Sequence, residues 1–451
     1  MSNGKIDVKD RELCESLVRN AIQLGAGEAE VYYVRTRKLE VMFEKNDLQV
    51  PKGDNYEGIG IRVIRNGSQG FASTNILSRD SLDDALKSAL AIAAASPADP
   101  NYWLPEPAGI TPVPEIYDSH VNNVDLRQVV SQGKLLVEAA RGFDSRVTID
   151  SAAFGVQRET RFIANSKGVE AGEDSSSVWC IGMGFARDGQ DVSSFDAEYA
   201  VSCKLQDIDP VSVGRKLAEK VIRSLGAESI PSFKGSIILT PYAGLDLLIE
   251  PLIFSVNAEN IQNGQSQWKD KLGSEVSSPL LSITDDPAIP GKVGSTAFDR
   301  EGVPTRQLAI LERGVLNDYL YNCYTARKDG RMSNGHAVGT DRSVPGIGAM
   351  NLVVAPGEIP FGKMVEGVSR GLVVNRYSGS VDPVSGDFSG VVKGGHYVES
   401  GEIVKPVKEI MIAGNIYELL RRITAVSKEV MTLENVTLPY VEMDGCSVTG
   451  K

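Results

Sequence analysis

Apolar residues recur at two different spacings along the first half of the chain. Residues 9–25 place leucine, valine and alanine three or four positions apart, which predicts a helix that stops at Gly25. From residue 28 onward, in AEVYYV and KLEVMF, apolar residues occupy every second position, which predicts strands with one buried face. The dipeptide Asn66-Gly67 suits a tight hairpin turn. The same helical spacing predicts further helices at 81–95, 125–140 and 211–225.

Five short strands are predicted between the last two of these helices. Turns such as NSKG and RDGQ join them into an antiparallel meander, near 146–156, 159–165, 168–172, 175–187 and 192–202. Six prolines fall between residues 97 and 114, and because proline resists helix and central strand we expect an ordered surface connector there. The first domain is predicted to span residues 1–230 as an antiparallel sheet with flanking helices.

The pattern changes after residue 235, where glycine and proline become frequent and apolar runs become short. Many short strands separated by turns predict a barrel-like or strongly curved antiparallel sheet, in a second domain that spans residues 231–451. Two helices are predicted inside it, near 242–262 and 415–426. The fold class is therefore α+β, with two domains.

The predicted helix at 242–262 has an apolar stripe and one carboxylate, Glu250, followed by Pro251. A proline removes one helical hydrogen bond, so a kink is expected, and Glu250 is expected to bond to free backbone donors or to an arginine. A zinc peptidase would place histidines beside such an acid. The chain has only three histidines, and the glycine-flanked His336 and His396 are expected in solvent-exposed turns. No metal site is predicted.

Composition narrows the classes of partner. The net charge is −12, and lysine and arginine do not gather in one run, which argues against nucleic acid or an anionic membrane as the main partner. No apolar run approaches the roughly 20 residues that span a bilayer, and the N-terminus does not read as a signal peptide. The five scattered cysteines favour free thiols in a reducing cytoplasm.

Long motifs in the second half resemble the TldD/PmbA metallopeptidase family, in its PmbA branch, also called TldE. They are FDREGVPTRQLAILERGVLNDYLYNCYTARKDG at 298–330, NLVVAPGE at 351–358, SGDFSGVVKGGHYVESGEIVKPVKEIMIAGNIYELLRRI at 385–423 and VEMDGCSVTG at 441–450. The first half matches more loosely, in the order of its elements and in GIGIRVIRNGSQGFAST.

This resemblance implies a subunit that does not itself catalyse. The TldD branch carries HExxxH on a helix, and those three positions fall here on Ile249, Glu250 and Phe254, so both histidines are replaced by hydrocarbon. Such chains pair with a TldD-type zinc subunit into a cytoplasmic heterodimer that encloses a proteolytic chamber for unfolded or extended peptides. The zinc is expected in that partner, and the isolated chain could form a homodimer.

A substrate or partner groove is expected where glycine-rich loops meet the second sheet. Six residues are assigned to it: Arg327, Asn334, His336, Asp387, Phe388 and Ser389. Two alternatives stay open. One is an independent, metal-free hydrolase that uses Glu250, Asp387 and Ser389, with Arg327 as an anion clamp. The other is an adaptor or regulatory protein that binds targets without proteolysis.

Overall fold

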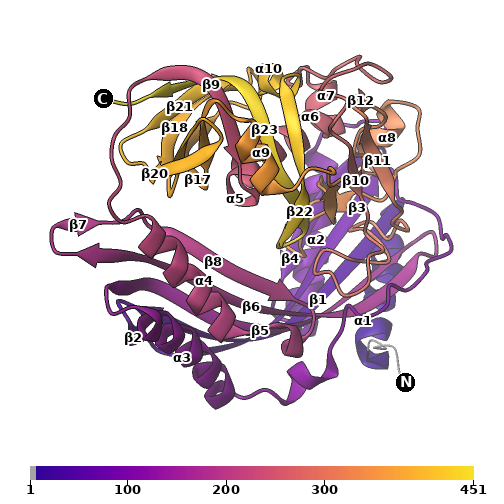
Figure 1. Ribbon diagram of the computed structural model, residues 1–451. Coiled ribbons are helices and arrows are strands. Elements are labelled where there is room, and N and C mark those ends of the chain that lie inside the picture. The colour runs from indigo at the N-terminus through magenta and orange to yellow at the C-terminus, as the bar shows by residue number, and fades with distance from the viewer. Residues whose placement is uncertain (1–6) are drawn as a thin grey trace.

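The computed structural model describes residues 7–451, which form two β-sheets, each with its own helices (Figure 1). The first sheet has eight strands in the order β4-β3-β1-β5-β6-β7, with β2 paired to β1 and β8 to β6, and neighbouring strands run antiparallel. Its strands are β1 (Glu28–Glu44), β2 (Asp47–Leu48), β3 (Lys52–Arg65), β4 (Ser68–Thr74), β5 (Val147–Asn165), β6 (Glu170–Asp188), β7 (Asp191–Val192) and β8 (Asp196–Ser202).

The alternation in β1 sends its odd-numbered side chains toward the helices. Tyr33 belongs to a core cluster with α1 and α2, whereas Leu39 and Val41 belong to a second cluster with α3 and α4. The helical elements of this half are α1 (Val8–Gln23), α2 (Arg79–Ala95), η1 (Ser119–Asn123), α3 (Leu126–Phe143), η2 (Leu205–Asp207) and α4 (Pro210–Arg223). The helices therefore cover one face of the sheet at its two ends.

Two turn predictions are confirmed, and two predicted breaks between strands are wrong. Gly25 follows α1 with φ +97°, and Asn66 and Gly67 join β3 to β4 with φ values of 52° and 80°. The predicted breaks near residue 157 and residue 174 are absent, because both segments continue as 19-residue strands. Pairing of β5 with β1 and β6 along nearly its whole length holds the polar middle of the strand in extended conformation.

The second sheet has thirteen strands, along the path β12-β11-β10-β15-β23-β9-β16-β19-β20, with β17, β18, β21 and β22 off this path. It is mixed, because β15 runs parallel to β23 and β16 runs parallel to β9. Its strands are β9 (Phe233–Leu239), β10 (Ile283–Asp285), β11 (Leu308–Glu312), β12 (Val315–Leu316), β15 (Leu352–Val354), β16 (Arg370–Val374), β17 (Arg376–Val381), β18 (Asp387–Lys393), β19 (His396–Glu399), β20 (Glu402–Pro406), β21 (Met411–Asn415), β22 (Ile423–Leu433) and β23 (Val436–Thr449).

The predicted antiparallel barrel is wrong on both counts, because this sheet is mixed and open. The long strand β23 pairs with β22 and β15 along its first part and with β9 and β21 along its last part. Its pairing with β9 shifts register between Met443 and Cys446. An irregularity of this kind turns the strand and branches the sheet, so that β12 and β20 remain as separate ends.

The helices of the second half are short, and they correct two sequence predictions. They are α5 (Pro241–Gly244), η3 (Leu245–Ile249), α6 (Glu250–Val256), α7 (Ala258–Gln262), α8 (Cys323–Lys328), α9 (Phe361–Gly367) and α10 (Ile416–Leu420). The helix predicted at 242–262 breaks at Asn257, which caps α7. The helix predicted at 415–426 ends at Leu420, because β22 begins at Ile423. Within residues 7–451, no helix has the length and apolar character needed to cross a bilayer.

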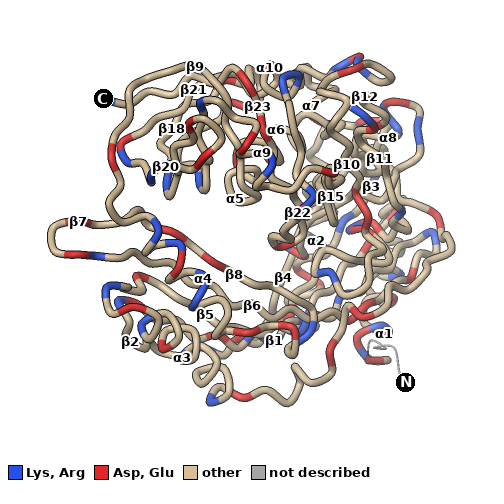
Figure 2. Tube along the Cα trace, viewed as in Figure 1, with Lys and Arg blue, Asp and Glu red and all other residues tan. Residues whose placement is uncertain are grey.

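The second half packs on the helix-free face of the first sheet. Tyr32, Val34 and Ile163 on that face form one cluster with Ala297 and Phe298 from the loop before β11. Later in the chain, β13 (Ala337–Val338) and β14 (Gly346–Ile347) pair with each other as a separate two-stranded sheet. Acidic and basic residues are interspersed along both halves (Figure 2).

Candidate functional site

The helix predicted to carry Glu250 is built from three consecutive segments, α5, η3 and α6. The middle segment, Leu245–Ile249, is a π-helical turn, and the Glu250 N–H donates to the carbonyl of Leu245, five residues back. Pro251 follows at once and has no N–H to continue an α-helical ladder. The kink predicted at Pro251 stays a prediction; what the backbone has just before this residue is the widened turn, a feature frequent at functional sites.

The three positions of the degenerate motif differ in their surroundings. Ile249 is buried in the main core of the second half, Phe254 is partly exposed and Glu250 is exposed. No hydrogen bond or ion pair reaches the Glu250 carboxylate from residues 7–451, so the expected backbone or arginine partner is wrong. Isoleucine and phenylalanine offer no donor atom, and the described residues contain no cluster of three metal-ligating side chains. These residues do not fit a zinc ion.

One turn before Glu250, Asp246 faces the same side of this helix. Partial burial, together with the negative charge of Glu250, raises the pKa of Asp246 to about 6, although Arg376 on β17 acts in the opposite direction. A carboxyl of raised pKa near a second carboxylate is an arrangement that acid–base chemistry can use. Sequence reasoning missed Asp246, although its spacing from Glu250 was a readable signal.

A hollow of about 510 Å³ opens at Thr240, immediately before α5, and both halves of the chain line it. Lys220, Arg223 and Asp196 come from α4 and β8, whereas His396 and Val404 come from β19 and β20. Hollows between domains, with apolar walls and a few polar groups, are the usual place for ligands. This hollow and the adjoining helix are the candidate site.

The strand β8 forms one wall of this hollow, and two buried acidic residues fix that wall to neighbouring elements. Asp196 accepts a hydrogen bond of 2.6 Å from the Asn375 side chain, and burial raises the pKa of Asp196. Glu198, two positions further along β8, accepts a hydrogen bond from the Tyr242 hydroxyl at 2.7 Å and lies 2.6 Å from the Lys220 ammonium. Tyr242 belongs to α5, so these contacts fix the start of the candidate helix against the first sheet.

The expectation that His396 is open to solvent is wrong. Its side chain is largely covered, and burial followed by the charge of Arg223 lowers the pKa of His396. Next to it, β20 lies at one end of the sheet, paired with β19, and the Glu228 N–H donates to its last carbonyl, at Pro406, at 3.2 Å. Ile403 and Val404 on β20 are 46% and 53% exposed, which is unusual for two consecutive aliphatic residues on a free strand edge.

His336 is also buried, which overturns its predicted exposure. Its ring nitrogens lie 2.9 Å from the Asn334 amide oxygen and 2.9 Å from an Asp285 carboxylate oxygen, and its side chain is fully shielded. The Asn334 oxygen also accepts the Tyr321 N–H. The ring is therefore held between the Asn334 oxygen and an Asp285 carboxylate oxygen, one at each ring nitrogen. The sequence could not predict this burial, because the partner Asp285 is 51 residues away and no local pattern connects it to His336.

The six residues assigned to a groove lie in three places: on α8, in the loop that follows it and on β18. Arg327 is exposed on α8, with its guanidinium 5.8 Å from the Trp103 ring, while Asn334 and His336 lie inside the loop that follows α8. The other three lie on β18: Asp387 and Ser389 are exposed and Phe388 is in the core. The 510 Å³ hollow includes none of the six.

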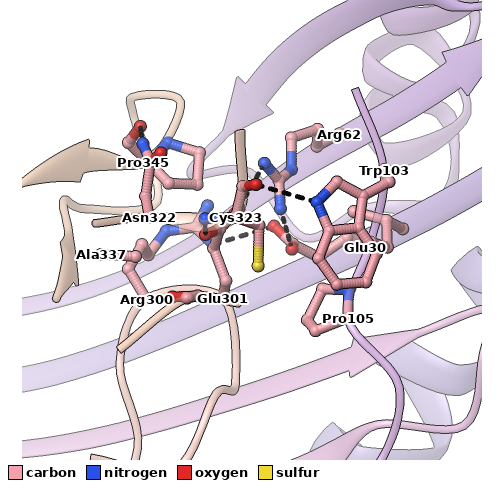
Figure 3. Close-up of polar contacts among 12 residues, drawn as sticks. Glu30, Arg62, Trp103, Pro105, Arg300, Glu301, Asn322, Cys323, Ala337 and Pro345 are labelled. Atoms are coloured by element: carbon pink, nitrogen blue, oxygen red, sulfur yellow. Dashed lines mark hydrogen bonds and ion pairs between the residues drawn. The ribbon is translucent and has the colours of Figure 1, made fainter. Parts of the chain in front are cut away.

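A buried ionic cluster joins the two halves (Figure 3). Arg62 on β3 lies 2.5 Å from Glu30 and 2.9 Å from Glu301, and Arg300 lies 2.9 Å from Glu30. All four side chains are at most 5% exposed. Asp299, just before Arg300, accepts the N–H groups of Glu301 and Val303 and so forms a local turn. Sequence reasoning missed that Arg300 and Glu301 reach across to the first sheet.

The proline-rich segment 97–114 runs beside this cluster and contains neither helix nor strand. The Trp103 indole N–H donates to the carbonyl of Cys323 at 2.8 Å (Figure 3). The Asn165 side chain donates to the carbonyl of Pro105 at 2.9 Å. Cys323 N–H in turn donates to Glu301. The segment is therefore fixed to both halves of the chain.

Sequence models of one protein family match most of the chain. The PmbA/TldA metallopeptidase domain 1 matches residues 29–93, the central domain of the same family matches residues 119–225, and its C-terminal domain matches residues 232–450. Among curated proteins, the metalloprotease PmbA homologue of Haemophilus influenzae is 27% identical over all of this chain and 98% of its own length. The metalloprotease PmbA of Escherichia coli O157:H7 is 26% identical, over 98% of this chain and 97% of its own.

Solved structures share the fold. A Thermotoga maritima protein superposes with a TM-score of 0.89 at 29% identity, covering 98% of this chain and all of that one. TldE from Thermococcus kodakarensis superposes with the same TM-score at 23% identity, covering 97% of this chain and all of that one. The similarity thus extends over both sheets and over the helices between them.

Proposed function

The chain belongs to the PmbA/TldD metallopeptidase family, and from this premise we propose that it is a non-catalytic, TldE-type subunit of a two-chain zinc metallopeptidase. One observation carries the proposal. By the family resemblance, the two histidines of HExxxH fall on Ile249 and Phe254, which lie in η3 and α6 and cannot ligate a metal. Zinc and its general base then come from a TldD-type partner in a cytoplasmic heterodimer.

The substrate in this proposal is an extended or unfolded peptide. The strand β20 lies at one end of the sheet beside the 510 Å³ hollow, and although the Glu228 N–H donates to its last carbonyl, at Pro406, a peptide added along the rest of the strand would gain backbone bonds without strong sequence demand. Ile403 and Val404 supply apolar contact area. We further propose that residues 1–230 and 231–451 act as two domains that form this chain's share of the chamber wall.

The first experiment measures metal and activity together. The purified chain should contain no stoichiometric zinc by mass spectrometry and should leave unfolded casein intact, and cleavage should begin when a TldD-type chain is added. The double variant Ile249→His/Phe254→His tests the motif directly, with Ile249→Leu/Phe254→Leu as the matched control: only the histidine variant should gain zinc. Chelator-sensitive cleavage by the isolated wild-type chain would overturn the proposal.

The second experiment tests the peptide edge. Val404→Glu should raise the KM of the assembled complex for an unfolded peptide several-fold without changing kcat, because it places a charge on the apolar edge. Met332→Glu is the matched control, because Met332 is an exposed apolar residue outside this hollow, at 74% exposure. Equal KM values for the two variants would exclude β20 as the peptide edge.

The carboxylate pair at Asp246 and Glu250 favours a second candidate, a metal-free hydrolase. In that case the isolated chain would hydrolyse small ester or amide substrates, and Asp246→Asn or Glu250→Gln would abolish turnover with the fold intact. Asp387 and Ser389, which the sequence placed in the same role, lie on β18 and serve as the comparison variants. Absence of turnover by the wild-type chain, across ester and peptide probes, would exclude this candidate.

A further inference from the structure

The helix-covered face of the first sheet has an uncovered middle. The helices α1 and α2 pack over one end of this face and α3 and α4 over the other, and a hollow of about 760 Å³ lies between them. Its volume is in the range of small-molecule sites. The residues that line it are Arg35, Thr36, Arg37, Asn55, Tyr56, Glu57, Asn75, Asn122, Arg158 and Thr160.

At this hollow, the side chains on the helix-covered face of the sheet change from apolar to basic, whereas on either side of it they belong to the core. On β1, Arg35 and Arg37 take the alternate positions between Tyr33 and Leu39, both of which are buried under the helices. On β5, Arg158 takes the corresponding position. Hydrophobic side chains here would have continued the core, so charged ones cost stability and call for a compensating interaction.

Two of these arginines are direct neighbours across the sheet. Arg37 is the register partner of Arg158, and like charges opposite each other in an antiparallel pair are destabilising. Arg158 lies 3.2 Å from Asp174 but also has a buried Nε atom without an acceptor. Arg35 is balanced by Asp10 at 2.8 Å and by Glu57 at 3.9 Å.

Arg37 is the cation that the fold does not neutralise. Its guanidinium donates to the backbone carbonyls of Asn122 at 2.7 Å and Val124 at 3.3 Å, and no carboxylate of residues 7–451 pairs with it. The carbonyls orient the group without cancelling its charge. An exposed, oriented guanidinium beside a second guanidinium is an arrangement that binds carboxylate or phosphate oxygens through paired N–H donors.

We propose that this hollow is a binding site for a small polyanion that carries phosphoryl or carboxylate groups. One anionic group bridges Arg37 and Arg158 and relieves their repulsion, and the side-chain amides of Asn55 and Asn75 donate to the rest of the ligand. Glu57 is the one acidic residue of the lining and disfavours ligands whose charge extends to its side of the hollow. The site lies on the face of the first sheet opposite the second half, so it is separate from the proposed peptide edge.

The test is calorimetric titration of the full chain with pyrophosphate, with citrate and with acetate, each at low and at high ionic strength. Pyrophosphate or citrate should bind saturably with one site per chain, weaken as salt rises and exceed acetate in affinity by at least tenfold. Whichever of the two binds more tightly identifies the anionic group. Failure of both to bind at low salt overturns the proposal.

Two variants separate ligand binding from a structural role. Arg37→Gln should weaken the polyanion at least tenfold while the melting temperature without ligand stays the same or rises, because repulsion with Arg158 is gone. Arg215→Gln removes an exposed arginine of α4 outside the lining and should bind as the wild type does. Equal loss of affinity in both variants, or no loss in Arg37→Gln, contradicts a site at this hollow.

Discussion

Replacing Glu30 by glutamine tests whether the buried ionic cluster holds the two halves together. Glu30 and Glu301 balance Arg62 and Arg300, so the four side chains carry no net charge. The substitution keeps the shape but leaves one uncompensated positive charge among side chains that are at most 5% exposed. Removing one partner of such a buried group costs about 3–5 kcal/mol, a large share of the roughly 5–15 kcal/mol that stabilises a protein.

The same substitution has a predicted pH dependence. Burial raises the pKa of Glu30, but Arg62 and Arg300 outweigh burial and bring the pKa below its usual value. A carboxyl whose pKa is lower in the folded state stabilises that state above its unfolded pKa, near 4, and loses this contribution as the pH falls through the folded value. The difference between wild type and Glu30→Gln should therefore shrink below about pH 4.

Urea denaturation followed by tryptophan fluorescence measures both effects, since Trp103 is bonded beside the cluster. Glu219→Gln is the control, because its i,i+4 contact with Arg223 is 3.9 Å long and lies on the surface of α4. The double variant Glu30→Met/Arg300→Met removes one charge of each sign and should recover much of the lost stability. A cost below about 1 kcal/mol for Glu30→Gln at neutral pH would refute this reasoning.

Three further changes probe other parts of the chain. Asp246→Asn should raise the free energy of unfolding by about 1–2 kcal/mol at pH 8 and leave it nearly unchanged at pH 4. The reason is that a carboxyl whose folded pKa is raised to about 6 destabilises the folded state once it ionises. Urea denaturation at the two pH values checks this. His336→Gln removes the ring that contacts both Asn334 and Asp285 and should cost about 1–3 kcal/mol by calorimetry, and an unchanged stability would contradict a structural role for these two contacts. Gly214→Ala should lower the melting temperature, since its Cβ would lie 2.3 Å from the Leu136 carbonyl oxygen where α4 meets α3, whereas Gly142→Ala, with open space around it, should not.

Local patterns predicted the elements whose neighbours lie close in the chain. The two-residue alternation from residue 28 became β1, and the three-to-four spacing before Gly25 became α1, because burial of one face selects the period in each case. The irregularity at Pro251 was also a local matter, since it depends on a missing N–H. The absence of metal-ligating atoms at Ile249 and Phe254 can likewise be seen from the residue types alone.

Distant pairing decided the elements that sequence reasoning placed wrongly. The residues after Leu420 looked helical but extend as β22, because Ile423 to Leu433 pair with β23. The sheet predicted to close as a barrel stays open, because β23 changes partners at its register shift. Neither result has a signature within the segment concerned, since the hydrogen bonds that select the conformation come from another strand.

The sequence by itself determined which side chains can do chemistry, including the inability of Ile249 and Phe254 to hold a metal. Only the tertiary structure decided where the charged residues meet. Arg300 reaches Glu30 across 270 positions, His336 contacts Asp285, and the charge of Arg376 on β17 acts on Asp246. A buried charge is stable only beside its partner, and that partner is selected by how the sheets pack rather than by separation along the chain.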